Sequence, residues 1–394
     1  MIFCRVQREK YYFFGMHRMR IAIFLNRLQL NGIHRMRLNL AREFLKIGHE
    51  LDFVVGQAVG EMRSQLPVEA NLHVIASRGS FFFLPGLVRY LHTRKPDYIL
   101  SAYEDINIMV IFVNRVLGRH SKVLVSTHNA LWPLRIEGRW THRFKNRLLL
   151  SLLGSAYRKA DAVVAVSHGL AKELSEVTGI SPSHIRVIYN PVISDRFDAQ
   201  VNETLSSELE PFFIDPVIGF FGRLREQKNL EILVEAFGLL RLHGVRCKLL
   251  IVGEGEKKSV INELVVSSGL DGDVLFHDFV DNPFGLMRHC TVVALSSKYE
   301  GLPNVLTEAM ACGTQVVSTD CPHGAAEILE NGKWGQLVPV GDAPALADAL
   351  QRTLTKRFWV APELLRERGL EFSAEHAAHA YLGVLGASLP LTRK

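Results

Sequence analysis

The stretch RIAIFLNRLQLNGIHRMRLNLAREFLKIGHELDFVV, Arg20 to Val55, contains the alternation that decides the fold. Its apolar run 20–25 predicts a β-strand, residues 35–48 predict an amphipathic helix, and 51–55 predict a second strand. A strand, a helix and a second strand in this order form a βαβ unit, in which the two strands pair in parallel.

The same alternation continues along the chain in two series. Further strands of the first series are predicted at 98–102, 122–127 and 162–167, and those of the second series at 217–222, 248–253, 274–280, 291–297 and 314–320. Runs of consecutive apolar residues are typical of strands buried on both faces of a doubly wound sheet. We therefore expect an α/β fold with two Rossmann-like doubly wound lobes, whose strand ends face a central cleft.

The two series are separated by Asn190-Pro191 and a polar stretch at 194–211, which predicts an interdomain linker. The expected organisation has four parts: a start extension at 1–18, which leaves Met1, Met16 or Met19 as the start; an N-terminal lobe at 19–195; a C-terminal lobe at 196–371; and a terminal segment at 372–394, with a helix at 372–385.

Charge is divided unevenly over the 394 residues. Residues 1–190 carry 27 Lys and Arg against 13 Asp and Glu, and the remainder carry 19 against 27. A basic first half suits an anionic membrane surface, a phosphorylated acceptor or a nucleic acid. That half contains no helix-turn-helix, RNP or zinc motif, which disfavours a nucleic-acid-binding protein.

The five cysteines have no C-x-x-C spacing, so neither a zinc site nor a disulfide framework is predicted, and a reducing compartment is the simplest expectation. No run reaches the roughly 18 uncharged apolar residues of a spanning helix. These features predict a cytoplasmic protein.

The segment YEGLPNVLTEAMACG, Tyr299 to Gly313, predicts an anion site at a helix start. Pro303 suits the first helical turn, with Glu300 in the loop before the helix and Glu308 inside it. The free N–H groups of a first turn and the helix dipole favour a diphosphate, and adjacent carboxylates accept hydrogen bonds from sugar hydroxyls. The alternative is a solvated glutamate pair around an ordinary helix.

The segment FFGRLREQKN, Phe220 to Asn229, places two cations where a predicted strand ends at Gly222. Arg223 and Lys228 suit a pyrophosphate, the first through bidentate contact and the second as a point charge. The alternative is a charged surface loop. In IVGEGE, Gly253 and Gly255 begin a dinucleotide fingerprint, but its third glycine position holds Lys258, so nicotinamide chemistry is not supported.

In the first lobe, Gly32 follows the first strand and would let backbone approach a ligand closely. His128 ends the predicted strand 122–127 and should point into the cleft, with His34 and His168 as weaker candidates. A packed structural histidine is the alternative for each of them.

Taken in order, GRLREQKN, IVGEGE, EGLPNVLTEAMACG and DCPHGAAEIL resemble family 4 of the retaining glycosyltransferases, which has the GT-B fold. The resemblance implies that Arg223 and Lys228 bind the donor phosphates, that Glu308 holds the ribose, and that Glu300 contacts the donor sugar. It further implies that backbone around Leu302, Pro303 and Asn304 cradles the phosphates, that Gly222 and Gly253 belong to the donor loops, and that His128 and Gly32 complete the site from the first lobe.

The resemblance also implies a nucleotide-sugar donor, without cofactor or metal. A UDP-sugar is expected, with GDP-mannose as the alternative donor and a GT-B epimerase as the alternative enzyme. The expected acceptor is lipid-linked or belongs to a surface polysaccharide or lipopolysaccharide. The basic segment 139–159 with its apolar run 148–153, and the cluster 81–84, predict peripheral contact with an anionic cytoplasmic membrane face. The alternative is that the run 148–153 is the core face of an ordinary helix and the charges are its solvated flanks.

Overall fold

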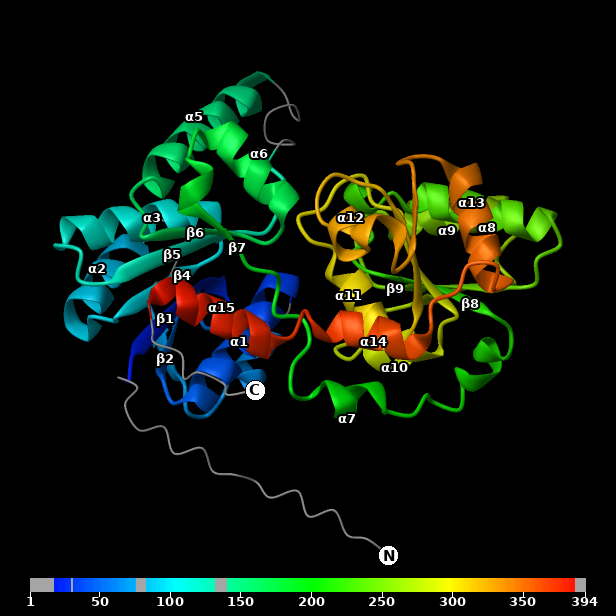
Figure 1. Ribbon diagram of the computed structural model, residues 1–394, viewed down its shortest axis with the longest axis horizontal. Coiled ribbons are helices and arrows are strands. Elements are labelled where there is room, and N and C mark those ends of the chain that lie inside the picture. The colour runs from blue at the N-terminus through cyan, green and yellow to red at the C-terminus, as the bar shows by residue number, and fades with distance from the viewer. Residues whose placement is uncertain (1–17, 30, 76–82, 132–139, 387–394) are drawn as a thin grey trace, which may run out of the picture.

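The computed structural model describes residues 18–29, 31–75, 83–131 and 140–386, and it consists of two parallel α/β lobes side by side (Figure 1). The expected fold class is confirmed.

The first lobe is built on a seven-stranded parallel sheet in the order β3-β2-β1-β4-β5-β6-β7. Its strands are β1 (Arg20–Arg27), β2 (Glu50–Gln57), β3 (Asn71–Val74), β4 (Tyr98–Ser101), β5 (Lys122–Thr127), β6 (Ala162–Ala165) and β7 (Ile185–Val187). The second lobe has six parallel strands in the order β10-β9-β8-β11-β12-β13. They are β8 (Val217–Phe221), β9 (Lys248–Val252), β10 (Val274–His277), β11 (Val292–Leu295), β12 (Gln315–Thr319) and β13 (Gln336–Val338).

Helices cover both faces of each sheet, as β1 illustrates. Ile21, Ile23 and Leu25 pack in one apolar cluster, whereas Ala22 and Phe24 pack in another, and all five are fully buried. Since successive side chains of a strand point to opposite faces, an unbroken apolar run requires two covered faces.

In the first lobe, α1 (Gly32–Ile47) and α15 (Ala374–Leu385) contribute to the cluster on one face. The other face is covered by α2 (Phe83–Arg94), α3 (Glu104–Val116), α5 (Trp140–Tyr157) and α6 (His168–Thr178). In the second lobe, α8 (Leu230–Leu242), α9 (Lys258–Ser267) and α13 (Ala343–Leu354) cover one face, and the other carries α10 (Phe284–His289), α11 (Asn304–Ala311), α12 (Ala325–Ile328) and α14 (Pro362–Leu370).

The first helix begins three residues before the predicted start at residue 35. The Asn31 side-chain oxygen accepts a hydrogen bond from His34 N, which makes Asn31 the N-cap and places Gly32 in the first turn. The helix ends at Ile47 because Gly48 adopts a left-handed conformation, with φ of 102°. Gly32 therefore lies in the first turn of the helix, and its approach to a ligand stays a prediction.

The polar stretch predicted as a linker contains structure of its own. It holds α7 (Phe197–Val201), and the ring of Phe197 packs edge-on against Phe284 of α10 with centroids 4.9 Å apart. Further along the chain, α15 returns to the first lobe, where Tyr98 Oη donates to the Leu385 carbonyl over 2.9 Å. The boundary at residue 195 stays a prediction.

Short 3₁₀ helices complete the chain: Glu61–Gln65, Pro182–His184, Glu210–Ile214, Glu226–Lys228 and Glu330–Gly332. Among the described helices, none combines the length and the apolar character that crossing a membrane requires.

Candidate active site

The loop after β8 is tied to the loop after β11, so that two predicted motifs meet. Ser296 Oγ donates to the Lys228 carbonyl over 2.7 Å, and Gln227 Nε2 donates to the Tyr299 carbonyl over 2.8 Å. Asn229 has a left-handed φ of 49°, a conformation that asparagine tolerates, and it ends the loop before α8 begins. The carboxyl ends of adjacent parallel strands thus bring both motifs to one edge of the sheet.

Lys228 and Glu300 form the centre of this edge. Lys228 Nζ lies 2.6 Å from Glu300 Oε1, and Ser297 Oγ donates to the same carboxylate oxygen over 2.7 Å. The two side chains are only 18% and 10% exposed, so both charges are largely withdrawn from water. Such a pair is held in one geometry and offers a cation and an acceptor at the same point.

Helix α11 begins beside this pair. Pro303 is its N-cap, one residue before the helix rather than within the first turn as predicted, and no side chain caps the helix. Leu302 and Pro303 are buried, and Asn304 opens the first turn. Because the proline N-cap supplies no side-chain acceptor, the first N–H groups of this helix and the positive end of its dipole are available to an anion.

Glu308 projects from the second turn of α11. Burial raises the pKa of its carboxyl group, an effect that Arg35 and Lys228 oppose by their positive charge. Arg35 comes from α1 of the first lobe, and its Nη1 lies 3.9 Å from Glu308 Oε1 while its Nη2 donates to the Asp281 carbonyl over 3.0 Å. The ribose-binding candidate is thus contacted across the cleft.

Arg223 follows Gly222 at the end of β8, and its side chain is exposed. The charge of Arg223 contributes to lowering the pKa of His34, for which burial is the larger cause, so the guanidinium lies toward the first lobe. The backbone of Gly253 packs directly against this loop, because a Cβ at Gly253 would lie 2.0 Å from the Gly222 carbonyl oxygen. Gly253 therefore shapes the arginine loop through backbone packing.

His128 follows β5 in the first lobe and is 9% exposed. Its Nε2 lies 2.9 Å from Ser126 Oγ, and its Nδ1 is buried without a hydrogen-bond partner in the described part of the chain. Burial, reinforced by the Arg37 guanidinium, lowers the pKa of His128 to about 3. The imidazole is therefore neutral at physiological pH.

The two lobes touch at this histidine. A Cβ at Gly301 would lie 2.0 Å from the His128 carbonyl oxygen, so only glycine allows this approach. Ser167 Oγ donates to the Gly301 carbonyl over 2.8 Å, and Asn190 Nδ2 donates to Asn304 Oδ1 over 2.7 Å. The contacts place His128 opposite the loop of Glu300 and the start of α11.

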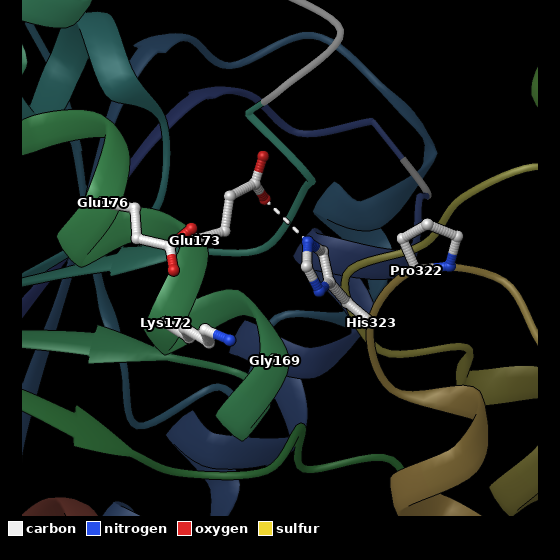
Figure 2. A pocket seen from close by; sticks show the side chains of 6 residues that line it. All are labelled: Gly169, Lys172, Glu173, Glu176, Pro322 and His323. Carbon is white, nitrogen blue, oxygen red and sulfur yellow. Dashed lines mark hydrogen bonds and ion pairs between the residues drawn. The ribbon is translucent and has the colours of Figure 1, made fainter.

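A pocket of about 370 Å³ opens between the lobes beside this contact. Figure 2 shows Glu173 of α6 directed at His323, with Glu173 Oε2 and His323 Nε2 2.9 Å apart, and Lys172 and Glu176 on the same helix. The pocket borders the candidate site, since the Pro322 carbonyl accepts from Glu300 N over 3.1 Å. Gly32, in contrast, has open space around its Cβ position, so no described protein atom requires a glycine there.

Each of the two lobes matches its own protein-family model. Residues 30–196 match the family model described as Glycosyltransferase Family 4, and residues 215–356 match the model described as Glycosyl transferases group 1. The chain is 30% identical over 290 residues to alpha-D-kanosaminyltransferase of Streptomyces kanamyceticus, an alignment that covers 71% of this chain and 70% of that protein.

The chain belongs to family 4 of the glycosyltransferases.

Two other relatives of this family 4 glycosyltransferase come from Rhizobium meliloti and Campylobacter jejuni. The lipopolysaccharide core biosynthesis glycosyltransferase LpsE of Rhizobium meliloti is 31% identical over 259 residues, or 62% of this chain and 71% of that one. The N-acetylgalactosamine-N,N'-diacetylbacillosaminyl-diphospho-undecaprenol 4-alpha-N-acetylgalactosaminyltransferase of Campylobacter jejuni is 32% identical over 209 residues, or 53% of this chain and 54% of that one. This chain thus spans little more than half of the Campylobacter relative's length.

Among solved structures, Anabaena HepE in complex with UDP-glucose superimposes with a TM-score of 0.78 at 19% identity, over 93% of this chain and 99% of that one. The match shows that the family 4 chain has the GT-B fold.

Three residues near the site of this family 4 chain were not predicted from its motifs. Arg35, Ser126 and Asn190 stand in segments without a recognisable motif, and they reach the site through helix α1 and the ends of β5 and β7. One of the three, Ser126, could have been found from the sequence. It stands two residues before His128, and residues two apart in a strand lie on the same side.

Proposed function

We propose that the protein is a retaining hexosyltransferase that moves a sugar from a UDP-sugar to a lipid-linked or surface-glycan acceptor. One observation supports this most directly: Lys228, Glu300 and Glu308 converge beside the start of α11, opposite His128 of the other lobe. Cations, an uncapped helix start and sugar-binding carboxylates are what a nucleotide-sugar diphosphate and its hydroxyls require.

Each residue of the site has a role in the proposed reaction. The N–H groups of the first turn of α11, with Arg223 and Lys228, bind the diphosphate and stabilise the charge that develops on it. Glu308 accepts hydrogen bonds from the ribose hydroxyls, and Glu300 accepts from the donor sugar. The Lys228–Glu300 contact means that both groups are already oriented before the donor binds.

Transfer proceeds on one face of the donor sugar. The bond between the anomeric carbon and the phosphate oxygen breaks, and the acceptor hydroxyl oxygen forms its bond on the same face. The departing phosphate oxygen takes the acceptor's proton, so that no side chain has to act as a general base. Positive charge at the diphosphate performs the role that a metal ion has in other transferases.

The choice of donor and acceptor class rests on relatives. HepE, which superimposes on this chain, is in complex with UDP-glucose. One sequence relative is named for lipopolysaccharide core biosynthesis, and another for transfer to a diphospho-undecaprenol acceptor. GDP-mannose remains the second donor to test.

A donor panel in the presence of EDTA tests the proposal. We expect turnover of at least one UDP-sugar with retained anomeric configuration and without added metal. Turnover confined to GDP-mannose would replace the donor assignment, full dependence on a divalent ion would contradict the metal-free mechanism, and no release of nucleotide from any donor, with or without a membrane acceptor fraction, would contradict the transferase itself.

The first lobe also has an apolar surface that suits a peripheral membrane contact. Of the apolar run predicted to meet the membrane, Leu150 and Leu153 are buried in the core, whereas Leu152 is 49% exposed. Residues 81 and 82 and the side chains of Arg143, Lys145 and Arg147 lie outside the described part of the chain. The predicted run is thus partly core, as its alternative interpretation required.

Neighbouring helices on the same face supply the better candidate. Phe112 and Val116 of α3 are 63% and 68% exposed, and Leu84 of α2 is 44% exposed. Arg89 and Arg115 are exposed on the same two helices. We propose that this apolar face of α2 and α3, with its arginines, contacts an anionic membrane that presents the acceptor.

A further inference from the structure

A chain of buried contacts connects the C-terminal helix to His128. Arg37 of α1 lies with its guanidinium carbon 5.7 Å from the ring centroid of Tyr381 on α15, and its Nη1 donates to Tyr381 Oη over 3.5 Å. Arg37 Nη2 donates to Ser126 Oγ, which in turn lies 2.9 Å from His128 Nε2. None of the four side chains belongs to a residue more than 9% exposed.

The hydroxyl group of Ser126 determines where the imidazole proton must lie. Ser126 Oγ also lies 3.1 Å from the Ser101 carbonyl oxygen, which can only accept. A hydroxyl has one hydrogen and two lone pairs, so its hydrogen goes to Ser101 and its lone pairs receive two donors. Arg37 is one donor, and His128 Nε2–H must be the other. With the proton on Nδ1 instead, the contact to Ser101 or to Nε2 would bring two lone pairs together.

This arrangement leaves Nδ1 of His128 as an acceptor. That atom is buried without a partner in the described part of the chain, as is Oδ1 of Asn190. The Asn190 side chain lies beside the ring, since it raises the pKa of His128 against the larger effects of burial and of Arg37. Asn190 is in turn held by Asn304 at the start of α11, so both unpartnered atoms lie where the lobes meet.

We propose that Arg37 and Ser126 are positioning residues that fix His128 as the Nε2–H tautomer, so that its buried Nδ1 is left as an acceptor where the two lobes meet. Tyr381 holds Arg37 in place, which makes the C-terminal helix part of the support of the site. The effect of this tautomer on sugar transfer rests on the proposed function, whereas the tautomer itself does not.

Nitrogen NMR of the full-length protein with ¹⁵N-labelled histidine measures the tautomer directly, with the His128 signals identified as those missing in His128→Gln. We expect a protonated Nε2 and an unprotonated Nδ1. In Ser126→Ala, which removes the acceptor of Nε2–H, the fraction of the Nδ1–H tautomer should increase. In Arg37→Met, where Ser126 loses one of its donors, a mixture of both tautomers is expected.

Ser121→Ala is the matched control. Ser121 is also buried, but it lies between α3 and β5, at the end of β5 opposite to His128. It should show the wild-type pattern. A protonated Nδ1 in the wild type, or a wild-type pattern in both Ser126→Ala and Arg37→Met, would overturn the inference. The wild-type spectrum alone tests it if either variant fails to fold.

Donor kinetics add a readout on the function. Ser126→Ala should lower kcat/KM for the UDP-sugar about tenfold, the effect of one misdirected hydrogen bond, and leave the affinity for UDP unchanged because UDP lacks the sugar. A chain that transfers no sugar but shows the expected tautomer would refute the proposed function and leave this inference standing. An unchanged kcat/KM in Ser126→Ala would show that the tautomer has no part in transfer.

Discussion

At the scale of single residues, Glu308 and Arg223 belong to the same proposed donor site but have different expected effects. Glu308 is largely buried and would contact a ribose that is present throughout the reaction, whereas Arg223 is exposed and would act on charge that develops as the phosphate leaves. An interaction equally strong in ground and transition states changes affinity, and one that grows in the transition state changes turnover.

Glu308→Ala should therefore weaken UDP binding by about 1.5–3 kcal/mol, the value of a hydrogen bond to a charged group. Arg223→Ala should leave UDP affinity nearly unchanged and lower kcat about a hundredfold. Nucleotide titration and steady-state kinetics on both variants, with the exposed Glu263→Ala as a control, measure the difference. Wild-type behaviour in both variants would mean that the donor site lies elsewhere.

The lowered pKa of His128 has a consequence for stability at acid pH. The unfolded histidine takes up its proton near pH 6.5, whereas the folded one does so only near pH 3. Because the unfolded state binds more protons between these values, the free energy of unfolding decreases as the pH falls through that window.

His128→Gln should remove this part of the acid sensitivity, about 2 kcal/mol between pH 7 and pH 5. Denaturant unfolding at the two pH values measures it, with the exposed His243→Gln as the matched control. An equal loss of stability in wild type and His128→Gln would show that the imidazole titrates normally in the folded protein.

At the scale of elements, α2 and α3 show apolar side chains on an outer surface where a monomeric protein ordinarily shows polar ones. Phe112 and Val116 are one helical turn apart on α3, so they lie on one stripe. A stripe of this kind with arginines nearby is the feature that binds an interface by apolar area and by charge.

Phe112→Ser with Val116→Ser should reduce co-sedimentation with anionic vesicles at least about threefold, because each exposed apolar side chain contributes on the order of 1 kcal/mol to partitioning. Leu242→Ser is the control, since Leu242 is 82% exposed on α8 of the second lobe. High salt should weaken the remaining binding. Negligible binding of the wild type to both anionic and neutral vesicles would remove the membrane from the proposal.

At the scale of the whole molecule, contact between the lobes brings His128 and Arg35 to the motifs of the second lobe. Glu173 of α6 accepts from Leu131 N in the loop after His128 and also pairs with His323 of the other lobe, and Glu327 accepts from His168 N. These contacts surround the point where Gly301 meets the His128 carbonyl (Figure 2 shows the Glu173–His323 pair).

Gly301→Ala should hold the lobes apart, because its Cβ would overlap the His128 carbonyl oxygen. A displacement of about 1 Å between reacting groups costs on the order of a hundredfold in rate, so kcat should fall by that factor. Gly383→Ala in α15, which has open space around the new Cβ, is the control. Small-angle scattering should show a larger radius of gyration for Gly301→Ala alone, and wild-type turnover would show that this contact is dispensable.

The sequence by itself determined the fold class, because period and composition decide locally whether a segment is a strand or a helix. The apolar runs of β1, β5, β8 and β11 needed two covered faces, and two βαβ series with a polar break between them left few alternatives. The meeting of two motifs of the second lobe could also be predicted. Lys228 and Glu300 stand in the loops that follow neighbouring parallel strands, and the carboxyl ends of such strands lie at one edge of the sheet.

Only the tertiary structure decided which side chains of distant segments contact one another. Arg35 reaches Glu308 from 273 positions away in the chain, and Arg37 stands between Tyr381 and Ser126. No local pattern encodes such contacts, because they depend on the angle at which one packed lobe meets the other and on a terminal helix that returns to the first. The contact between Lys228 and Glu300 can therefore be predicted from the motifs of the second lobe, whereas the surroundings of His128 consist of side chains that only folding brings beside it.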